Sequence, residues 1–182
     1  MKNSKKKKTN IKESIDQNKY TFDLINQWIQ HAENKASLLL AFVIALSGII
    51  QLVCSKLIIP TYETTPKVFI IFIIVLTLGT VSFIMAIIFF LIVIFPSLTS
   101  FNSSENKYSI FFEDIASFQS FDSYHKVVIK TNDEQFNEEI IKEIYINSKI
   151  CSKKMKNIKR AMIYSIITSL FMIFELLLCW LS

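Results

Sequence analysis

Apolar residues occur in long blocks along this chain, and three blocks are candidates for membrane-spanning helices. The longest, residues 68–95, contains no charged residue and no proline. A helix needs about 20 predominantly apolar residues to cross a bilayer, so a helix over this block can cross it with some tilt. A soluble protein would need a large surrounding domain to bury every face of such a helix. Residues 36–59 and 161–181 are the other two predicted spans.

The residues before the first span are predicted to continue it as one helix. Residues 1–14 are rich in lysine and are expected to form a disordered basic tail. Residues 15–35 carry apolar side chains at helical spacing and predict an amphipathic cytoplasmic helix. Because no helix breaker separates this helix from residues 36–59, we expect one helix that begins near Ile15 and crosses the membrane.

The polar segments between the spans differ in length. Pro60 and Pro66 bracket a short connection, which makes the first two spans a hairpin. Residues 97–160 form a longer insert, in which Thr131 and Glu134 have the spacing of a helix start. The helix that starts there is expected to run into the third span. The predicted fold is an all-α membrane protein with three transmembrane helices, long cytoplasmic helical extensions and a helical cytoplasmic insert.

The distribution of basic residues predicts the orientation. Six of them crowd the start of the third span, namely Lys149, Lys153, Lys154, Lys156, Lys159 and Arg160. The connection between the first two spans holds only Lys56 and Lys67. Since lysine and arginine concentrate in cytoplasmic loops, we expect the N-terminus and the insert inside the cell and the C-terminus outside.

Gln51 and Glu175 are polar residues inside predicted spans, where such residues are costly and are functional candidates by default. Glu175 is the fifteenth residue after Arg160, and Gln51 is the sixteenth after Lys35. At ~1.5 Å per residue both lie roughly 22 to 24 Å along their helices. We expect them to face one another or to line one polar seam between protomers. The alternative is that Glu175 extends its carboxylate to the outer surface.

Small residues and cysteines in the spans predict further contacts. A stripe of small residues on the first span would let another helix approach closely. Its members are Ser37, Ala41, Ala45 and Gly48. Cys54 and Cys179 match in depth by the same residue count, so a disulfide between them is geometrically conceivable. The alternative is that both are ordinary free cysteines in apolar surroundings.

Composition limits the chemistry of the chain. Apolar residues make up 52% and charged residues 19%, which exceeds the apolar share of a typical soluble domain. The net charge of +5 comes almost entirely from lysine, so bidentate recognition of phosphate is limited to Arg160. The two glycines, Gly48 and Gly79, lie in apolar runs and cannot form a phosphate-binding loop. Neither the cysteines nor the histidines have ligand spacing. We therefore expect no metal, no cofactor, no catalytic residues and no enzymatic activity.

Three blocks of the sequence follow the pattern of a known family. Residues 31–39, HAENKASLL, are similar to an ADxKAxxLL signature at the start of the first span. Residues 111–117, FFEDIAS, followed by Tyr124, are similar to an aromatic-Phe-Gly-Asp-Ile block, and residues 146–154 to a QIxxxSxIxxxK stretch before the last span. Together these blocks resemble the Pycsar transmembrane effectors. The departures are Glu33, where the family has aspartate, and Glu113, where it usually has glycine.

The resemblance implies a bacterial antiphage effector. In this family a pyrimidine nucleotide cyclase makes cyclic CMP or cyclic UMP during infection, and the effector senses it and impairs the inner membrane, which causes growth arrest or cell death. The expected partners are this nucleotide, the lipid bilayer and further copies of the chain, since a three-span monomer leaves little room for a conducting path. No nucleic acid is expected. The alternatives are a trigger by another cyclic nucleotide or oligonucleotide, and a non-gated membrane adaptor that holds a protein partner.

The resemblance also places the expected sensing surface. The first ligand-binding residues that we expect are Glu33, Asn34 and Lys35, with Asp114, Tyr124 and Lys153 as neighbours. Lysine can meet a cyclic phosphate, a carboxylate or amide can meet the base edge, and an aromatic ring can stack on a pyrimidine. The alternative is structural: Lys35 extends to the membrane interface, and Glu33 pairs with a lysine of the long helix near Lys149.

Overall fold

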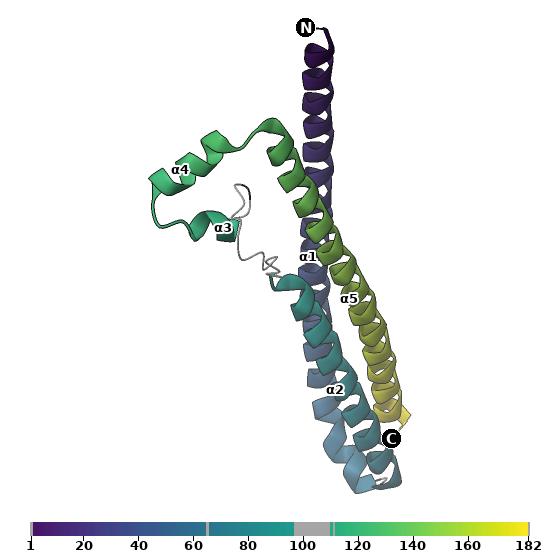
Figure 1. The fold of residues 1–182 in the computed structure, drawn as a ribbon. Helices are drawn as coiled ribbons and strands as arrows, with labels where there is room; N and C mark the ends of the chain where they lie inside the picture. The colour runs from purple at the N-terminus through teal and green to yellow at the C-terminus, as the bar shows by residue number, and fades with distance from the viewer. Residues whose placement is uncertain (1, 65, 97–109, 111, 182) are drawn as a thin grey trace. The chain divides into compact units, whose positions relative to one another are not determined.

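The computed structural model describes the backbone of residues 2–64, 66–96, 110 and 112–181, and the side chains of residues 10–53, 69–96, 110 and 114–178. This part of the chain forms five α-helices and no strand (Figure 1). They are α1 (Lys2–Thr64), α2 (Pro66–Ile94), α3 (Phe112–Ala116), α4 (Phe121–Lys130) and α5 (Asp133–Leu181). Among the described residues, three helical segments are long and apolar enough to cross a membrane: Asn10–Val53, Phe69–Ile94 and Asp133–Leu178. The predicted all-α class with three spans is confirmed.

Helix α1 is one continuous element that includes both the polar segment and the first span. It begins at Lys2, so the residues that were expected to form a disordered tail before Ile15 belong to the helix. The physical reason lies in the sequence: residues 2–14 contain neither glycine nor proline, and lysine is a good helix former. The helix also continues through Pro60 to Thr64, although proline was expected to end the span there. Bilayer-spanning helices tolerate proline better than isolated ones.

The chain divides into two compact units, and α1 and α5 each contribute to both. The insert unit comprises residues 1–30 and 97–152. The span unit comprises residues 31–96 and 153–182.

In the insert unit, α1 and α5 are joined by side-chain amides. Asn18 donates to Asn137 at 2.8 Å, and Asn137 donates to Ser14 at 3.3 Å. Further along the same two helices, Asn147 donates to Asn26 at 2.9 Å. Paired amides that meet at fixed positions of two helices set their register, because a shift would leave them unpaired.

Helix α5 begins with a reciprocal cap. The Asn132 side chain accepts from the Gln135 backbone at 2.8 Å, and the Gln135 side chain accepts from the Asn132 backbone at 3.2 Å. The sequence placed this start one residue earlier, at Thr131. In the structure Thr131 instead ends α4, where its backbone N–H donates to Val127.

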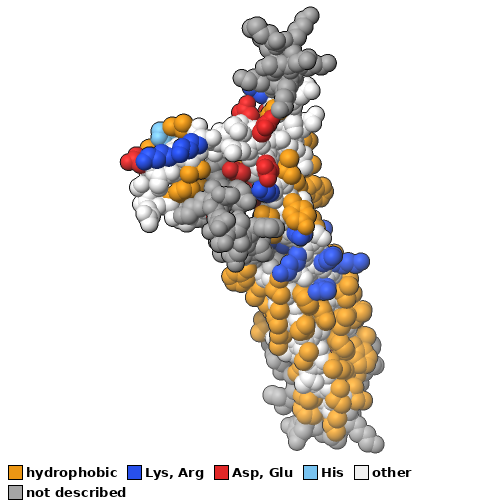
Figure 2. Space-filling model, viewed as in Figure 1, with side chains coloured by type: hydrophobic (Ala, Val, Ile, Leu, Met, Phe, Trp, Pro, Cys, Tyr) orange, Lys and Arg blue, Asp and Glu red, His pale blue; other side chains and the backbone are white. Residues whose placement is uncertain are grey.

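In the span unit, α1, α2 and α5 lie side by side (Figure 1). Their shared core combines four alanines with three larger apolar residues: Ala32, Ala36, Ala86, Ala161, Phe90, Val93 and Ile158. The small side chains let the helices approach closely, which is how helices in a membrane gain packing energy. The face visible in Figure 2 is covered by hydrophobic side chains, and Lys and Arg side chains gather at one end of it.

Candidate functional site

A buried lysine joins all three helices of the span unit. Lys154 of α5 is 2% exposed, and its Nζ lies 2.8 Å from Glu33 Oε1 of α1. The same ammonium group donates to the carbonyl oxygen of Val93 and, at 3.2 Å, to that of Phe95. Val93 lies in the last turn of α2 and Phe95 directly follows the helix, where the last helical carbonyl groups have no intrahelical partner. We refer to Lys154, Glu33 and these two carbonyl groups as the Lys154 junction.

The Lys154 junction satisfies the requirements of a buried charge. An ammonium group has three donors, and Glu33, Val93 and Phe95 provide three acceptors. A cation at a helix C-terminus also interacts favourably with the helix dipole. Removing one partner of such a buried ion pair is strongly destabilising because it leaves the other charge uncompensated. The junction therefore ties the end of α2 to α1 and α5.

The predicted ligand-binding residues of the span unit either belong to this junction or lie next to its members in the sequence. The Glu33 side chain is 34% exposed although it pairs with Lys154, so part of the carboxylate remains accessible. Asn34, Lys35 and Lys153 are exposed. The pairing expected as the structural alternative for Glu33, with a lysine near Lys149, is therefore present and involves Lys154.

The two other predicted ligand-binding residues belong to the insert unit. Asp114 lies in the short helix α3 and is half-buried. Tyr124 lies in α4, where its ring packs against Phe118 with the ring centroids 5.5 Å apart. Both side chains take part in contacts, so neither stands free to receive a ligand without rearrangement.

Glu143 is a buried carboxyl group of the insert unit. It lies on α5 before the third predicted span and is 8% exposed. Burial raises the pKa of Glu143, and the negative charges of Asp114 and Glu139 raise it further. The group is therefore biased toward its neutral form in the folded chain, and Asp114 and Glu143 are electrostatically coupled.

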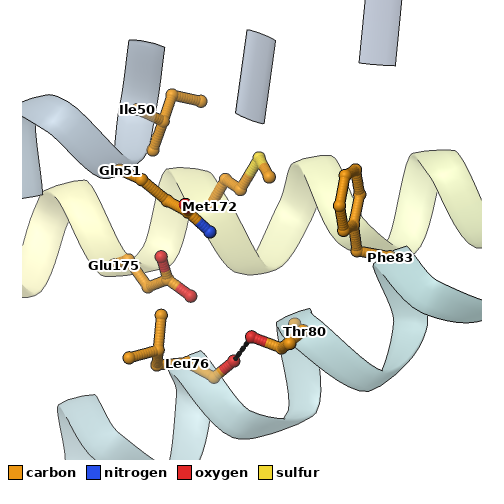
Figure 3. A pocket seen from close by; sticks show the side chains of 8 residues that line it. Ile50, Gln51, Leu76, Thr80, Phe83, Met172 and Glu175 are labelled. Atoms are coloured by element: carbon orange, nitrogen blue, oxygen red, sulfur yellow. Dashed lines mark hydrogen bonds between the residues drawn. The ribbon is translucent and has the colours of Figure 1, made fainter. Parts of the chain in front are cut away.

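Gln51 and Glu175 are brought together at a small polar cavity of the span unit (Figure 3). Gln51 comes from α1, Thr80 from α2 and Glu175 from α5, and the remaining lining is mostly apolar. The Glu175 side chain is buried, with 4% exposure. The two residues therefore share one cavity within a single copy of the chain, where the sequence suggested either a direct contact or a seam between copies.

The small residues of the spans fall into two groups. A Cβ atom added at Gly79 would lie 3.2 Å from Phe171 Cβ and 3.3 Å from Glu175 Oε1, so this glycine allows α2 and α5 to pack closely. A Cβ atom added at Gly48 would meet nothing within 4 Å. Ser37, Ala41 and Ala45 are exposed as well, so the predicted small-residue stripe faces away from the helices of its own span unit.

Cysteines and metal ligands add no site among the described residues. Cys151 is half-buried and free, and burial raises the pKa of its thiol, which disfavours the reactive thiolate. The side chains of Cys54 and Cys179 lie outside the described residues, and their pairing stays a prediction. In the described segments, no group of three or more His, Cys, Asp or Glu side chains could hold a metal ion.

The sequence pattern did not identify Lys154 or Glu143 as buried residues. The signal was present in their spacing along α5, because Ile140, Lys154, Ala161, Thr168 and Glu175 are separated by multiples of seven residues, and Glu143, Ile158 and Met172 lie three or four residues after members of this series. All of them are buried. A search for apolar periodicity alone passes over the charged members of such a stripe.

Comparison with known proteins identifies one family. A family model of the Pycsar effector protein domain matches residues 17–181, which is nearly the whole chain and includes the Lys154 junction and the cavity at Glu175. Neither the curated proteins nor the solved structures contain a significant match to the chain.

Proposed function

The chain belongs to the Pycsar effector family, and on this premise we propose that it is an antiphage effector that senses cyclic CMP or cyclic UMP and then impairs the bacterial inner membrane. The family implies a cyclic nucleotide signalling context. It is a family of effectors and not a known enzyme family. A pyrimidine nucleotide cyclase is the expected source of the signal.

The Lys154 junction is the observation that carries the proposal. It ties three helices of the span unit at the end where the basic residues gather, and all its contacts depend on one ammonium group. Asn34 and Lys35 directly follow Glu33, and Lys153 directly precedes Lys154. A ligand held by these neighbours would act on the junction through adjacent residues of the same helices. Weakening the junction would free the end of α2, which is a local change that three packed helices can transmit along their length.

The proposed ligand contacts follow from chemistry. Lys35 and Lys153 are exposed ammonium groups that can meet a cyclic phosphate. Asn34 and the accessible part of Glu33 offer hydrogen-bonding groups for a base edge. Asp114 and Tyr124 of the insert unit stay proposed ligand-binding residues, and the ring of Tyr124 can stack on a pyrimidine.

We further propose that several copies assemble in the membrane, with the N-terminus in the cytoplasm and the C-terminus outside. Support for assembly comes from Gly48 and its small neighbours Ala41 and Ala45, which are exposed on α1 and open to another helix. Support for the orientation comes from the basic residues between Lys149 and Arg160. A reporter fused after Ser182 tests the orientation, because activity of a cytoplasmic reporter there would contradict it.

The function is tested by measuring membrane potential with a dye in bacteria that express the full chain together with a cyclase for cyclic CMP or cyclic UMP. We expect depolarisation only when the effector and one of the two nucleotides are both present. Direct binding to the purified chain should weaken in the Lys35→Ala and Asp114→Ala variants. Unchanged affinity in both would refute the proposed site, and persistent polarisation with confirmed insertion would favour the adaptor function.

A further inference from the structure

The cavity between Gln51, Thr80 and Glu175 brings side-chain oxygen atoms of three helices together. Glu175 is 4% exposed and forms no hydrogen bond or ion pair with the residues that the structure describes. Its carboxyl group points into the cavity toward Gln51 (Figure 3). A carboxylate in the apolar interior of a membrane is costly unless a proton or a positive charge neutralises it.

Thr80 presents acceptors to the cavity as well. Its hydroxyl group donates to the Leu76 carbonyl at 2.8 Å, so its hydrogen is committed to its own helix (Figure 3). The lone pairs of Thr80 Oγ1 remain for a ligand. Gln51 adds an amide group to the lining. Rotation of this group can turn its oxygen, a neutral acceptor, toward the cavity. The polar lining is therefore a set of oxygen atoms contributed by three different helices.

The size of the cavity restricts its ligand. Its volume of about 20 Å³ is enough for one particle the size of a water molecule. The other lining residues are Ile50, Leu76, Gly79, Phe83 and Met172, and none of them is titratable. The described parts of the three spans, residues 36–53, 69–95 and 161–178, contain no lysine or arginine. Lys56 is the one basic residue within the expected spans, and it lies five residues beyond Gln51 in the sequence.

We propose that this cavity binds one alkali-metal ion, with Glu175 as its charged ligand. Gln51 Oε1 and Thr80 Oγ1 are its neutral ligands. Oxygen-only coordination suits hard cations, and the ion neutralises the carboxylate without a basic side chain. The bound cation links α1, α2 and α5 through one site, which stabilises the folded span unit. The site does not depend on the nucleotide and goes beyond the sensing function.

The full-length protein in nanodiscs of phosphatidylcholine tests the site. Thermal unfolding is followed by tryptophan fluorescence in lithium, sodium or potassium chloride and in N-methylglucamine chloride, each at a mildly acidic and a mildly alkaline pH. If an alkali-metal ion is the ligand, we expect a higher Tm in one alkali chloride than in N-methylglucamine chloride. A Tm that depends on pH but not on the choice of cation would overturn the proposal, because protonation of Glu175 alone would then neutralise the carboxylate. The shift with alkali chloride should be lost in Glu175→Gln, which keeps the shape and removes the charge.

Matched variants separate binding from folding. Thr80→Val removes one neutral ligand and should reduce the shift, whereas Thr77→Val should not, because Thr77 does not line the cavity and its hydroxyl group bonds to its own helix. Equal responses of the wild type and Glu175→Gln to the choice of salt overturn the proposal. A loss of the shift in Lys56→Gln also overturns it, because the neutralising group would then be that lysine.

Discussion

Lys154 Nζ lies 2.8 Å from Glu33 Oε1 while it also donates to the last carbonyl groups of α2. One side chain thus replaces the hydrogen-bond partners that the end of α2 lacks and compensates a carboxylate on α1. The two partners differ in exposure, since the Lys154 side chain is 3% exposed and the Glu33 side chain 34%. The ion pair therefore has one buried and one partly exposed member.

Replacing Lys154 should destabilise the span unit strongly. In Lys154→Met, the carbonyl groups of Val93 and Phe95 lose their donor and Glu33 loses its counter-charge, which costs on the order of 3 kcal/mol for a broken buried pair. Denaturant unfolding of the full chain in micelles measures this loss. Lys153→Met is the matched control, because it removes an exposed lysine at the adjacent position and should change stability little. Equal destabilisation by both variants would contradict the role of the junction.

Glu33→Gln tests the accessible side of the same pair. The amide can still accept a hydrogen bond from Lys154, and the pair is partly exposed, so we expect a loss of about 1 kcal/mol or less. If ligand binding acts by weakening this pair, the variant should depolarise the membrane at a lower cyclic nucleotide level than the wild type. Membrane potential measured over graded cyclase expression checks this, and an unchanged threshold would separate the junction from gating.

The sequence predicts the spans well because each is a long uninterrupted apolar block, and length and composition alone decide that feature. It predicts helix ends less well, as Lys2 and Pro60 illustrate. A basic segment without glycine or proline can be either helical or disordered, and a proline ends a helix only where its neighbours cannot satisfy the freed carbonyl group.

The candidate sites depend on pairings that no local pattern contains. Counting residues from Lys35 and from Arg160 predicted that Gln51 and Glu175 lie at a similar depth. The structure places both around one cavity, because both helices start from the same end of the span unit. The pairing of Glu33 with Lys154 could not be predicted in the same way, because it depends on the register of α5 against α1. That register depends on contacts far apart in the sequence, such as the core that Ala32 and Ala36 share with Ile158 and Ala161.

The amide contacts of the insert unit should contribute measurably to its stability. Asn137→Ala removes the hydrogen bonds with both Ser14 and Asn18, each of which contributes about 1 kcal/mol. Hydrogen exchange of the full chain should then be faster in residues 133–152. Ser148→Ala is the control, because the Ser148 hydroxyl group bonds only to Ile144 of its own helix. If exchange is as fast in the control variant as in Asn137→Ala, the contacts do not hold the helices together.

Glu143 should make the insert unit less stable as the pH rises. Burial and the charges of Asp114 and Glu139 raise its pKa in the folded chain, so the folded state binds the proton more tightly than the unfolded state. This contribution is favourable below the ordinary pKa of the carboxyl group and is lost as the pH rises through the raised value. Glu143→Gln should therefore be more stable than the wild type at neutral pH and lose this advantage in acid.

Thermal unfolding of the full chain over a pH series checks the Glu143 prediction. Glu138→Gln is the control, because Glu138 is an exposed carboxylate of the same helix, paired with Lys142 at 2.8 Å. Its pH profile should stay parallel to that of the wild type. A Glu143→Gln profile that also stays parallel would show that burial of this carboxyl group has no energetic cost.

The two glycines should respond differently to the same substitution. Gly79→Ala places a Cβ atom 3.2 Å from Phe171 Cβ and 3.3 Å from Glu175 Oε1, so α2 and α5 must shift apart, at a cost of about 1 to 3 kcal/mol. Gly48→Ala meets nothing within 4 Å in its own chain and should leave the stability of a single copy unchanged. If copies assemble through the open stripe around Gly48, however, Gly48→Leu should reduce the oligomer population in nanodiscs or native mass spectra. An oligomer that survives Gly48→Leu would place the contact between copies on another face of the span unit.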